Sequence, residues 1–147
     1  MSNDWMREYK RECLLDEHRA LSSFVEKEIV MTTITKLVAI VGWLLAIGDR
    51  PLPAVVAAVI ALWSVDMLYA YYGDIYKRRR LQVRAWLESL PKAGEADLSS
   101  WKTPANPFDG LARSEKISAL TGTIGSPAVS GVYILLVLLS LVVGGPR

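Results

Sequence analysis

The fold is decided by residues 29 to 73, which read IVMTTITKLVAIVGWLLAIG, then DRP, then LPAVVAAVIALWSVDMLYAYYG. Ile29 to Gly48 and Leu52 to Gly73 each supply the roughly 20 mainly apolar residues that a helix needs to cross a bilayer. The short link between them contains glycine, which ends a helix, and proline, which begins the next one. We therefore expect two membrane-spanning helices that run antiparallel as a tight hairpin.

A third apolar stretch lies near the C-terminus. Residues 117 to 146 carry no charge, and Ser126-Pro127 is typical of a helix cap followed by a first-turn proline. We assign residues 117–147 to a third span, with Ala128 to Val143 as its apolar centre. The ten residues before Ser126 are expected either to lie in the membrane interface or to re-enter the membrane.

Residues 1–28 precede the first span and show an amphipathic pattern. Apolar side chains recur there at helical spacing: Met6, Tyr9, Cys13, Ala20 and Phe24, flanked by Leu14, Leu21 and Val25. Most of the charged side chains fall off this stripe. No proline or glycine occurs before Gly42, so the pattern predicts one continuous helix from about Asp4 to Ile47.

Residues 74–116 separate the second span from the third and are rich in Lys and Arg. We expect a helix from Asp74 to Leu90 that ends at Pro91. From there to Arg113 we expect an irregular loop, because proline and glycine recur in it. Ser114 is a candidate cap for a short helix.

The distribution of Lys and Arg predicts the orientation of these segments. Fourteen of them lie in residues 1–28 and 74–116, whereas only Arg50 and Arg147 fall on the other side of the membrane. By the positive-inside rule, the first two segments are cytoplasmic and the C-terminus is outside. The expected fold is an all-α integral membrane protein with three transmembrane helices. A cytoplasmic amphipathic helix precedes the hairpin of residues 29–73, and a cytoplasmic basic helix and loop separates spans 2 and 3.

Lys36 and Asp66 are the only charged residues within the two apolar stretches, Ile29 to Gly48 and Leu52 to Gly73. They lie almost the same number of residues from the turn, so they are expected at the same depth. An unpaired charge in hydrocarbon is costly, and we expect the two to pair within one subunit or across an interface. In the alternative, Lys36 extends to the inner interface and Asp66 pairs with another polar group, for structure only. In the functional interpretation, one of them faces a pore or a conformational interface.

The expected helix after Asp74 carries a basic stripe. Lys77, Arg80 and Arg84 share one face, opposite an apolar arc. This stripe either binds a polyanion or only fixes topology and touches anionic lipid heads. Arg79 falls within the apolar arc and is expected to reach a carboxylate or a ligand. The candidate nucleotide-binding residues are Arg78, Arg79, Arg80, Arg84 and Trp86, with Trp101 as an alternative to Trp86 for stacking a base.

Catalytic motifs are missing from the sequence. The chain is 52% hydrophobic and 22% charged, with one histidine and one cysteine. It contains no CxxC, HExxH, GxSxG or phosphate-loop pattern. We therefore expect no catalytic residue, no metal site, no cofactor and no enzymatic activity.

The run Trp63-Ser64-Val65-Asp66-Met67-Leu68-Tyr69-Ala70-Tyr71-Tyr72, followed by Asp74 and the cations from Lys77 to Arg84, resembles a signature of small multi-span effectors in bacterial anti-phage defence. These include the three-span effectors of CBASS systems and the channel effector of the Hailong system. The resemblance in sequence covers residues 60 to 90. The rest of the chain is similar only in its architecture. It implies an oligomer in the bacterial inner membrane whose conductance is controlled by a nucleotide or oligonucleotide messenger from a partner nucleotidyltransferase. Activation would stop the infected cell.

Three functional hypotheses follow. The first is a nucleotide-controlled homo-oligomeric channel, for example a tetramer, that depolarises the membrane. Its pore would be lined by the first two spans at Thr32, Thr35, Lys36, Ser64 and Asp66. The second is a membrane-anchored adaptor that recruits a soluble partner and has no pore. The third is a holin-like toxin that needs no ligand.

Overall fold

The computed structural model describes residues 3–47, 49–101, 109 and 111–143. Its elements, in chain order, are α1 (Asn3–Ala46), α2 (Leu52–Ser89), the 3-10 turn η1 (Leu90–Lys92), α3 (Glu95–Ser100), α4 (Arg113–Ile124) and α5 (Pro127–Val143). Three stretches are long and apolar enough to cross a membrane: Asp4–Ala46, Leu52–Lys92 and Arg113–Val143. The prediction of an all-α chain with three candidate spans is therefore confirmed.

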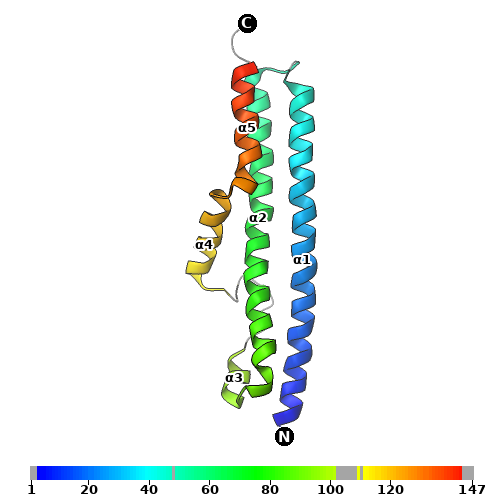
Figure 1. Ribbon diagram of the computed structural model, residues 1–147, viewed down its shortest axis with the longest axis vertical. Helices are drawn as coiled ribbons and strands as arrows, with labels where there is room; N and C mark the ends of the chain where they lie inside the picture. The colour runs from blue at the N-terminus through cyan, green and yellow to red at the C-terminus, as the bar shows by residue number, and fades with distance from the viewer. Residues whose placement is uncertain (1–2, 48, 102–108, 110, 144–147) are drawn as a thin grey trace.

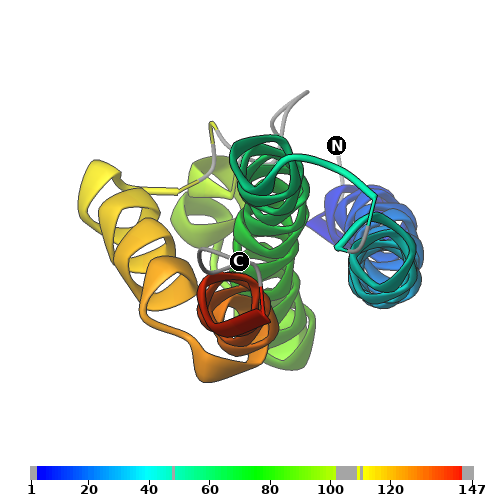
Figure 2. The same ribbon diagram turned by 90° about the horizontal axis from the view of Figure 1, so that it is seen from above.

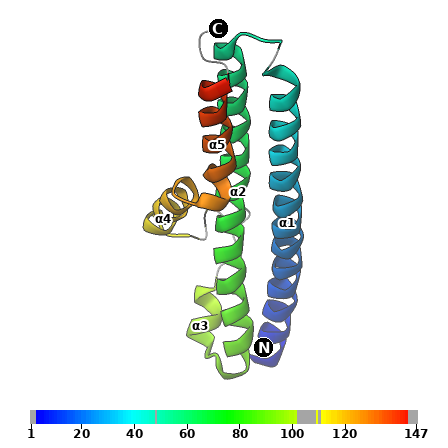
Figure 3. The same ribbon diagram turned by 45° about the horizontal axis from the view of Figure 1, so that its top comes forward.

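α1 and α2 form the long antiparallel hairpin that the sequence predicts. α1 is one unbroken helix of 44 residues, and α2 has 38. Proline occurs only in the first turn of α2, where its missing N–H group leaves no hydrogen bond unmade. The two helices lie side by side over their whole length (Figures 1 and 3). Because each exceeds the length of one span, both continue well beyond their apolar stretches.

α5 packs against the half of α2 that is next to the hairpin turn. α2 lies between α5 and most of α1 (Figure 2). The two outer helices also contact each other directly, and the Trp43 indole Nε1 donates a hydrogen bond of 2.6 Å to the Ser140 Oγ. The apolar core here is formed by Ala39 from α1, Val59 from α2, and Tyr133 and Leu136 from α5.

The third candidate span is broken near its middle. α4 ends at Ile124, α5 begins at Pro127, and α4 is tilted away from the line of α5 (Figures 1 and 3), while its Ala119 shares a buried core with Ile75 of α2. The expected cap Ser114 does not start α4. Instead, the Glu115 carboxylate accepts a hydrogen bond of 2.8 Å from the Ala112 N–H, one turn earlier. The residues before Ser126 thus form a helix of their own.

A second core lies at the N-terminal end of the hairpin, outside the apolar stretches. It is formed by Leu14 and Leu21 of α1, Val83 of α2, Leu90, Ala93, Leu98 of α3, and Trp101. Lys10 and Arg7 hold this end in place, because they donate hydrogen bonds to the carbonyl oxygens of Trp101 and Ala93. The loop expected between Pro91 and Arg113 therefore contains the short helix α3. Residues 102–108 and 110 of that loop lie outside the described residues.

The buried side of α1 is shifted from the expected stripe. Leu14, Leu21 and Val25 are buried, whereas Tyr9 and Ala20 are exposed. The apolar arc of this segment is broad, and α2 covers only one edge of it. Packing favours the edge with the larger aliphatic side chains, because they remove more apolar area from water than an alanine does.

Candidate functional site

Lys36 and Asp66 form the expected ion pair across the hairpin. The Lys36 Nζ lies 3.5 Å from the Asp66 Oδ2, and the Asp66 side chain is completely buried. At that distance the contact is a charge interaction and not a short hydrogen bond. The two residues pair within one subunit, which was one of the two arrangements that the sequence left open.

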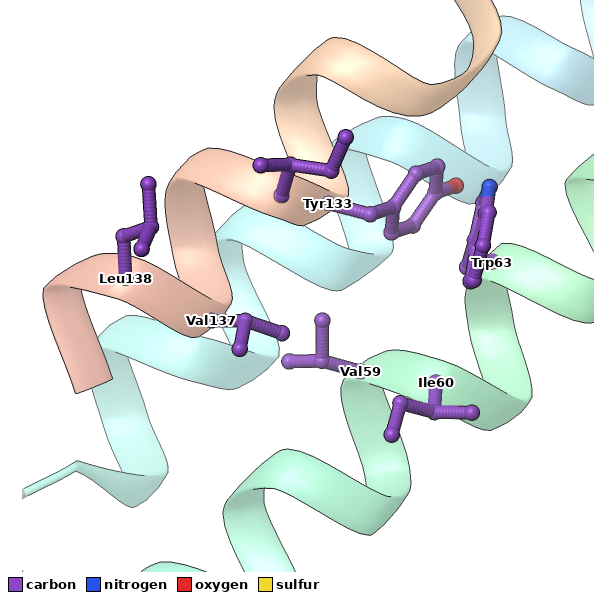
Figure 4. A pocket seen from close by; sticks show the side chains of 7 residues that line it. Val59, Ile60, Trp63, Tyr133, Val137 and Leu138 are labelled. Carbon is purple, nitrogen blue, oxygen red and sulfur yellow. The ribbon is translucent and has the colours of Figure 1, made fainter. Parts of the chain in front are cut away.

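Tyr133 of α5 is the third member of this polar cluster. Its side chain is 2% exposed, and its hydroxyl interacts electrostatically with the Asp66 carboxylate. Figure 4 shows that the same hydroxyl points toward the indole nitrogen of Trp63. Neither of these two groups completes a hydrogen bond within the described part of the chain. The cluster therefore joins all three spans through polar groups that are only partly satisfied.

The sequence signal for Tyr133 was weak but real. Tyr133 is the only tyrosine in the third apolar stretch, and it lies near the middle of that stretch. A buried tyrosine usually brings its hydroxyl to a polar partner. The spacing along one chain does not, however, show which helix will face it.

The two sides of the cluster differ in polarity. Toward the hairpin turn lies an apolar cavity of about 270 Å³, lined by Val59, Ile60, Val137 and Leu138 together with Trp63 and Tyr133 (Figure 4). Toward the N-terminal end lies a polar cavity of about 460 Å³ between α1, α2 and the joint of α4 with α5. Lys36 lines this second cavity. A polar route thus approaches the pair from one side, and an apolar layer covers the other.

Three ion pairs join α1 to α2 along the hairpin. Besides Lys36 with Asp66, Lys77 Nζ lies 3.0 Å from Glu28 Oε2, and Arg79 Nε lies 2.7 Å from Glu17 Oε1. Neither acidic partner was predicted from the sequence. The signal for Glu17 was its spacing: it lies three residues after Leu14 and four before Leu21, on the buried side of α1.

Arg79 and Trp86, two of the predicted nucleotide-binding residues, lie together in the N-terminal core. The Arg79 guanidinium is 1% exposed, and it lies 4.8 Å from the ring centre of Trp86. It donates hydrogen bonds to Glu17 and to the Gln82 Oε1. Arg79 thus reaches a carboxylate, which is one of the two outcomes the sequence allowed. Trp86 stacks on Trp101 with ring centres 5.8 Å apart.

The other three predicted cations lie elsewhere on α2. Arg78 pairs with Asp74 at 2.8 Å, and Arg84 pairs with Glu88 at 2.9 Å. Arg80 makes no hydrogen bond or ion pair with any residue that the structure describes. Arg80 and Arg84 are one turn apart on one face, whereas Arg78 and Arg79 point in other directions around the helix. The structure therefore does not gather the five residues into one pocket.

The hydroxyl groups expected to line a pore are bonded to their own helices. The side chains of Thr32, Thr35 and Ser64 donate to the carbonyl oxygens of Ile29, Met31 and Ile60, respectively. Thr32 is buried and lines the polar cavity, whereas Ser64 lies on the exposed surface. Such bonds let a hydroxyl group sit in an apolar helix without a tertiary partner.

Comparison with protein families, curated proteins and solved structures finds no match to this chain. Over the residues that the structure describes, no group of three or more His, Cys, Asp or Glu side chains could hold a metal ion. The function is therefore inferred from the geometry of the polar cluster and its surroundings.

Proposed function

We propose that this protein is a multi-pass membrane protein that assembles into a homo-oligomeric ion channel. The observation that carries the proposal is the buried pair of Lys36 and Asp66, with the polar cavity next to it. Ionisable groups inside a membrane segment are costly and usually mark an ion pathway or a conformational interface.

The surface of the three apolar stretches supports the membrane placement. Large aliphatic side chains point outward there: Leu45 is 74% exposed, Leu68 is 56% exposed and Val142 is 80% exposed. A water-soluble protein rarely shows so continuous an apolar surface. With the excess of Lys and Arg at the N-terminal end, we propose that this end is cytoplasmic and the hairpin turn is outside, in a bacterial inner membrane.

The energetics of the buried Lys36–Asp66 ion pair support a role for it other than stabilising the fold. Replacing a buried ion pair by apolar side chains of similar volume is often neutral or even stabilising, so stability alone explains the pair poorly. The pair lies at the contact of α1, α2 and α5, where a small shift of one helix would separate the charges. Such a site is suited to a gate that has a paired state and an unpaired state.

Several copies are required for a pore. One subunit encloses no continuous polar path through its described residues, because the apolar layer around Val59 and Val137 covers the pair on one side. A homo-oligomer, for example a tetramer, would bring the polar cavity of each subunit toward a common axis. We propose that this axis is the conduit.

Control by a nucleotide messenger is the further part of the proposal. It rests on the resemblance of the segment around Asp66 to anti-phage effectors. Of the predicted binding cations, Arg80 is the one without a bonded partner among the described residues, and Arg84 shares its face. We propose that these two cations contact the messenger, which a partner nucleotidyltransferase would make.

Planar-bilayer recording of the purified protein tests the channel. We expect discrete conductance that responds to a panel of cyclic nucleotides on the N-terminal side, and a changed open probability in Asp66→Asn.

An adaptor without a pore is the second candidate. It is favoured by the ion pairs and the N-terminal core, which hold α1 and α2 as one rigid unit. If the parent protein shows no conductance under any condition, the channel is excluded and the adaptor becomes the proposed function.

A further inference from the structure

The polar cavity has a chemical character of its own. It is lined by three cations, Lys36, Lys77 and Arg78, and by two carboxylates, Glu28 and Asp74. Thr32, Thr123 and Ser126 also reach it, so polar side chains come from α1, α2 and the joint of α4 with α5. With a volume of about 460 Å³, it is larger than the apolar cavity around Tyr133.

The cavity holds more hydrogen-bond donors than its own carboxylates use. Arg78 gives its Nε to Asp74, and its two terminal amino groups contact no acceptor among the described residues. Lys77 contacts Glu28 and keeps further donors, because an ammonium group has three. Each of the three cations is paired with one carboxylate, Asp66, Glu28 or Asp74, so it is the unused donors of Arg78 and Lys77 that suit an oxyanion.

The surface of α4, which borders this cavity, has the pattern of a helix at a membrane interface. The outward stripe of α4 is apolar: Ile117 is 53% exposed, Leu120 is 41% exposed and Ile124 is 46% exposed. Arg113 and Lys116 lie at its start, and Ala119 and Thr123 are buried on its opposite side. A short helix with this pattern, joined directly to a span, is suited to the membrane interface, which would place the neighbouring cavity at the level of the headgroups.

We propose that this cavity binds the phosphate group of a membrane phospholipid, with Arg78 and Lys77 as its main donors. The apolar stripe of α4 would then lie among the acyl chains of the same leaflet. Basic pockets between spanning helices on the cytoplasmic side are typical sites for anionic headgroups. The proposal rests on the membrane placement of the proposed function, but it does not require the protein to conduct ions.

The test uses two variants that break the same ion pair with opposite changes of charge. Arg78→Gln removes a donor, and Asp74→Asn removes a competing carboxylate. If the Arg78–Asp74 pair were only structural, both variants would change lipid binding in the same direction. An anion site predicts opposite directions: roughly fivefold weaker retention of phosphatidylglycerol in Arg78→Gln, and tighter retention in Asp74→Asn.

The full-length protein is reconstituted in nanodiscs of mixed phosphatidylglycerol and phosphatidylcholine, and the lipids that stay bound are counted by native mass spectrometry. Arg19→Gln is the matched control, because Arg19 pairs with Asp16 on its own helix at 3.1 Å but does not line the cavity. Its lipid retention should equal that of the parent.

Equal retention in the parent and Arg78→Gln would overturn the proposal. Binding of inorganic phosphate by the parent, with no phosphatidylglycerol retained, would overturn the assignment to a phospholipid. Circular dichroism checks that each variant is folded.

Discussion

Gly73 of α2 leaves the space that the Glu28 carboxylate of α1 occupies. A β-carbon at position 73 would lie 2.7 Å from the Glu28 Oε2, so no larger residue fits while that side chain keeps its place. Gly73 and Glu28 thus form a close crossing of α1 and α2, where Glu28 also meets Lys77. This contact lies between the polar cluster of the spans and the core at the N-terminal end.

Gly73→Ala is expected to destabilise the protein by about 1 to 3 kcal/mol, because the new methyl group displaces Glu28 from Lys77. In a Glu28→Ala background the same change should become neutral or slightly stabilising, since alanine favours a helix over glycine by about 1 kcal/mol. Gly42→Ala is the control, because a β-carbon there meets nothing within 4 Å. Thermal unfolding in detergent gives the values. A cost of Gly73→Ala that persists without Glu28 would rule out the steric explanation.

Breaking the pair in the spans should cost more than removing it. Lys36→Met is expected to lower the free energy of unfolding by at least about 2 kcal/mol, because the completely buried Asp66 loses its counter-ion. The double variant Lys36→Met with Asp66→Leu should recover most of that loss. A double-mutant cycle on thermal unfolding measures the coupling. Losses that simply add would mean that the two side chains do not stabilise each other.

Arg79 should matter far more than its neighbours on α2. Arg79→Ala is expected to cost about 2 to 4 kcal/mol, because it leaves Glu17 without a partner and removes the cation from the Trp86 ring. Arg79→Lys should recover only part of this, since an ammonium group cannot reproduce the forked contacts with Glu17 and Gln82. Arg84→Ala, in which an exposed pair is lost, should cost less than about 1 kcal/mol. Similar melting temperatures for Arg79→Ala and Arg84→Ala would contradict the structural role.

The orientation is tested by labelling with a membrane-impermeant maleimide in intact cells, in a Cys13→Ser background. A cysteine at the exposed Asp49 of the hairpin turn should react, and one at the exposed Ser100 of α3 should react only after the membrane is opened. Both sites are accessible in the fold, so a difference between them reports the side of the membrane. Labelling of position 100 but not position 49 in intact cells would reverse the proposed topology.

The one-dimensional pattern determined the elements of this protein. Apolar stretches of about 20 residues predict spans, and the lack of proline or glycine before Gly42 predicts the unbroken α1, because these features act locally along one helix. The contact of Lys36 with Asp66 could also be predicted, since a tight turn leaves two antiparallel helices in a single register.

Only the tertiary structure decided which side of each helix is covered. Tyr133 joins Asp66, and Glu17 joins Arg79, because α5 and the N-terminal half of α1 pack on particular faces of α2. The break between α4 and α5 could be predicted from Ser126-Pro127, but the direction of α4 and the polar cavity beside it depend on packing. Which face of a helix is buried depends on how it packs against side chains that are distant in the sequence. The hydropathy pattern along the chain does not show which distant side chains these are.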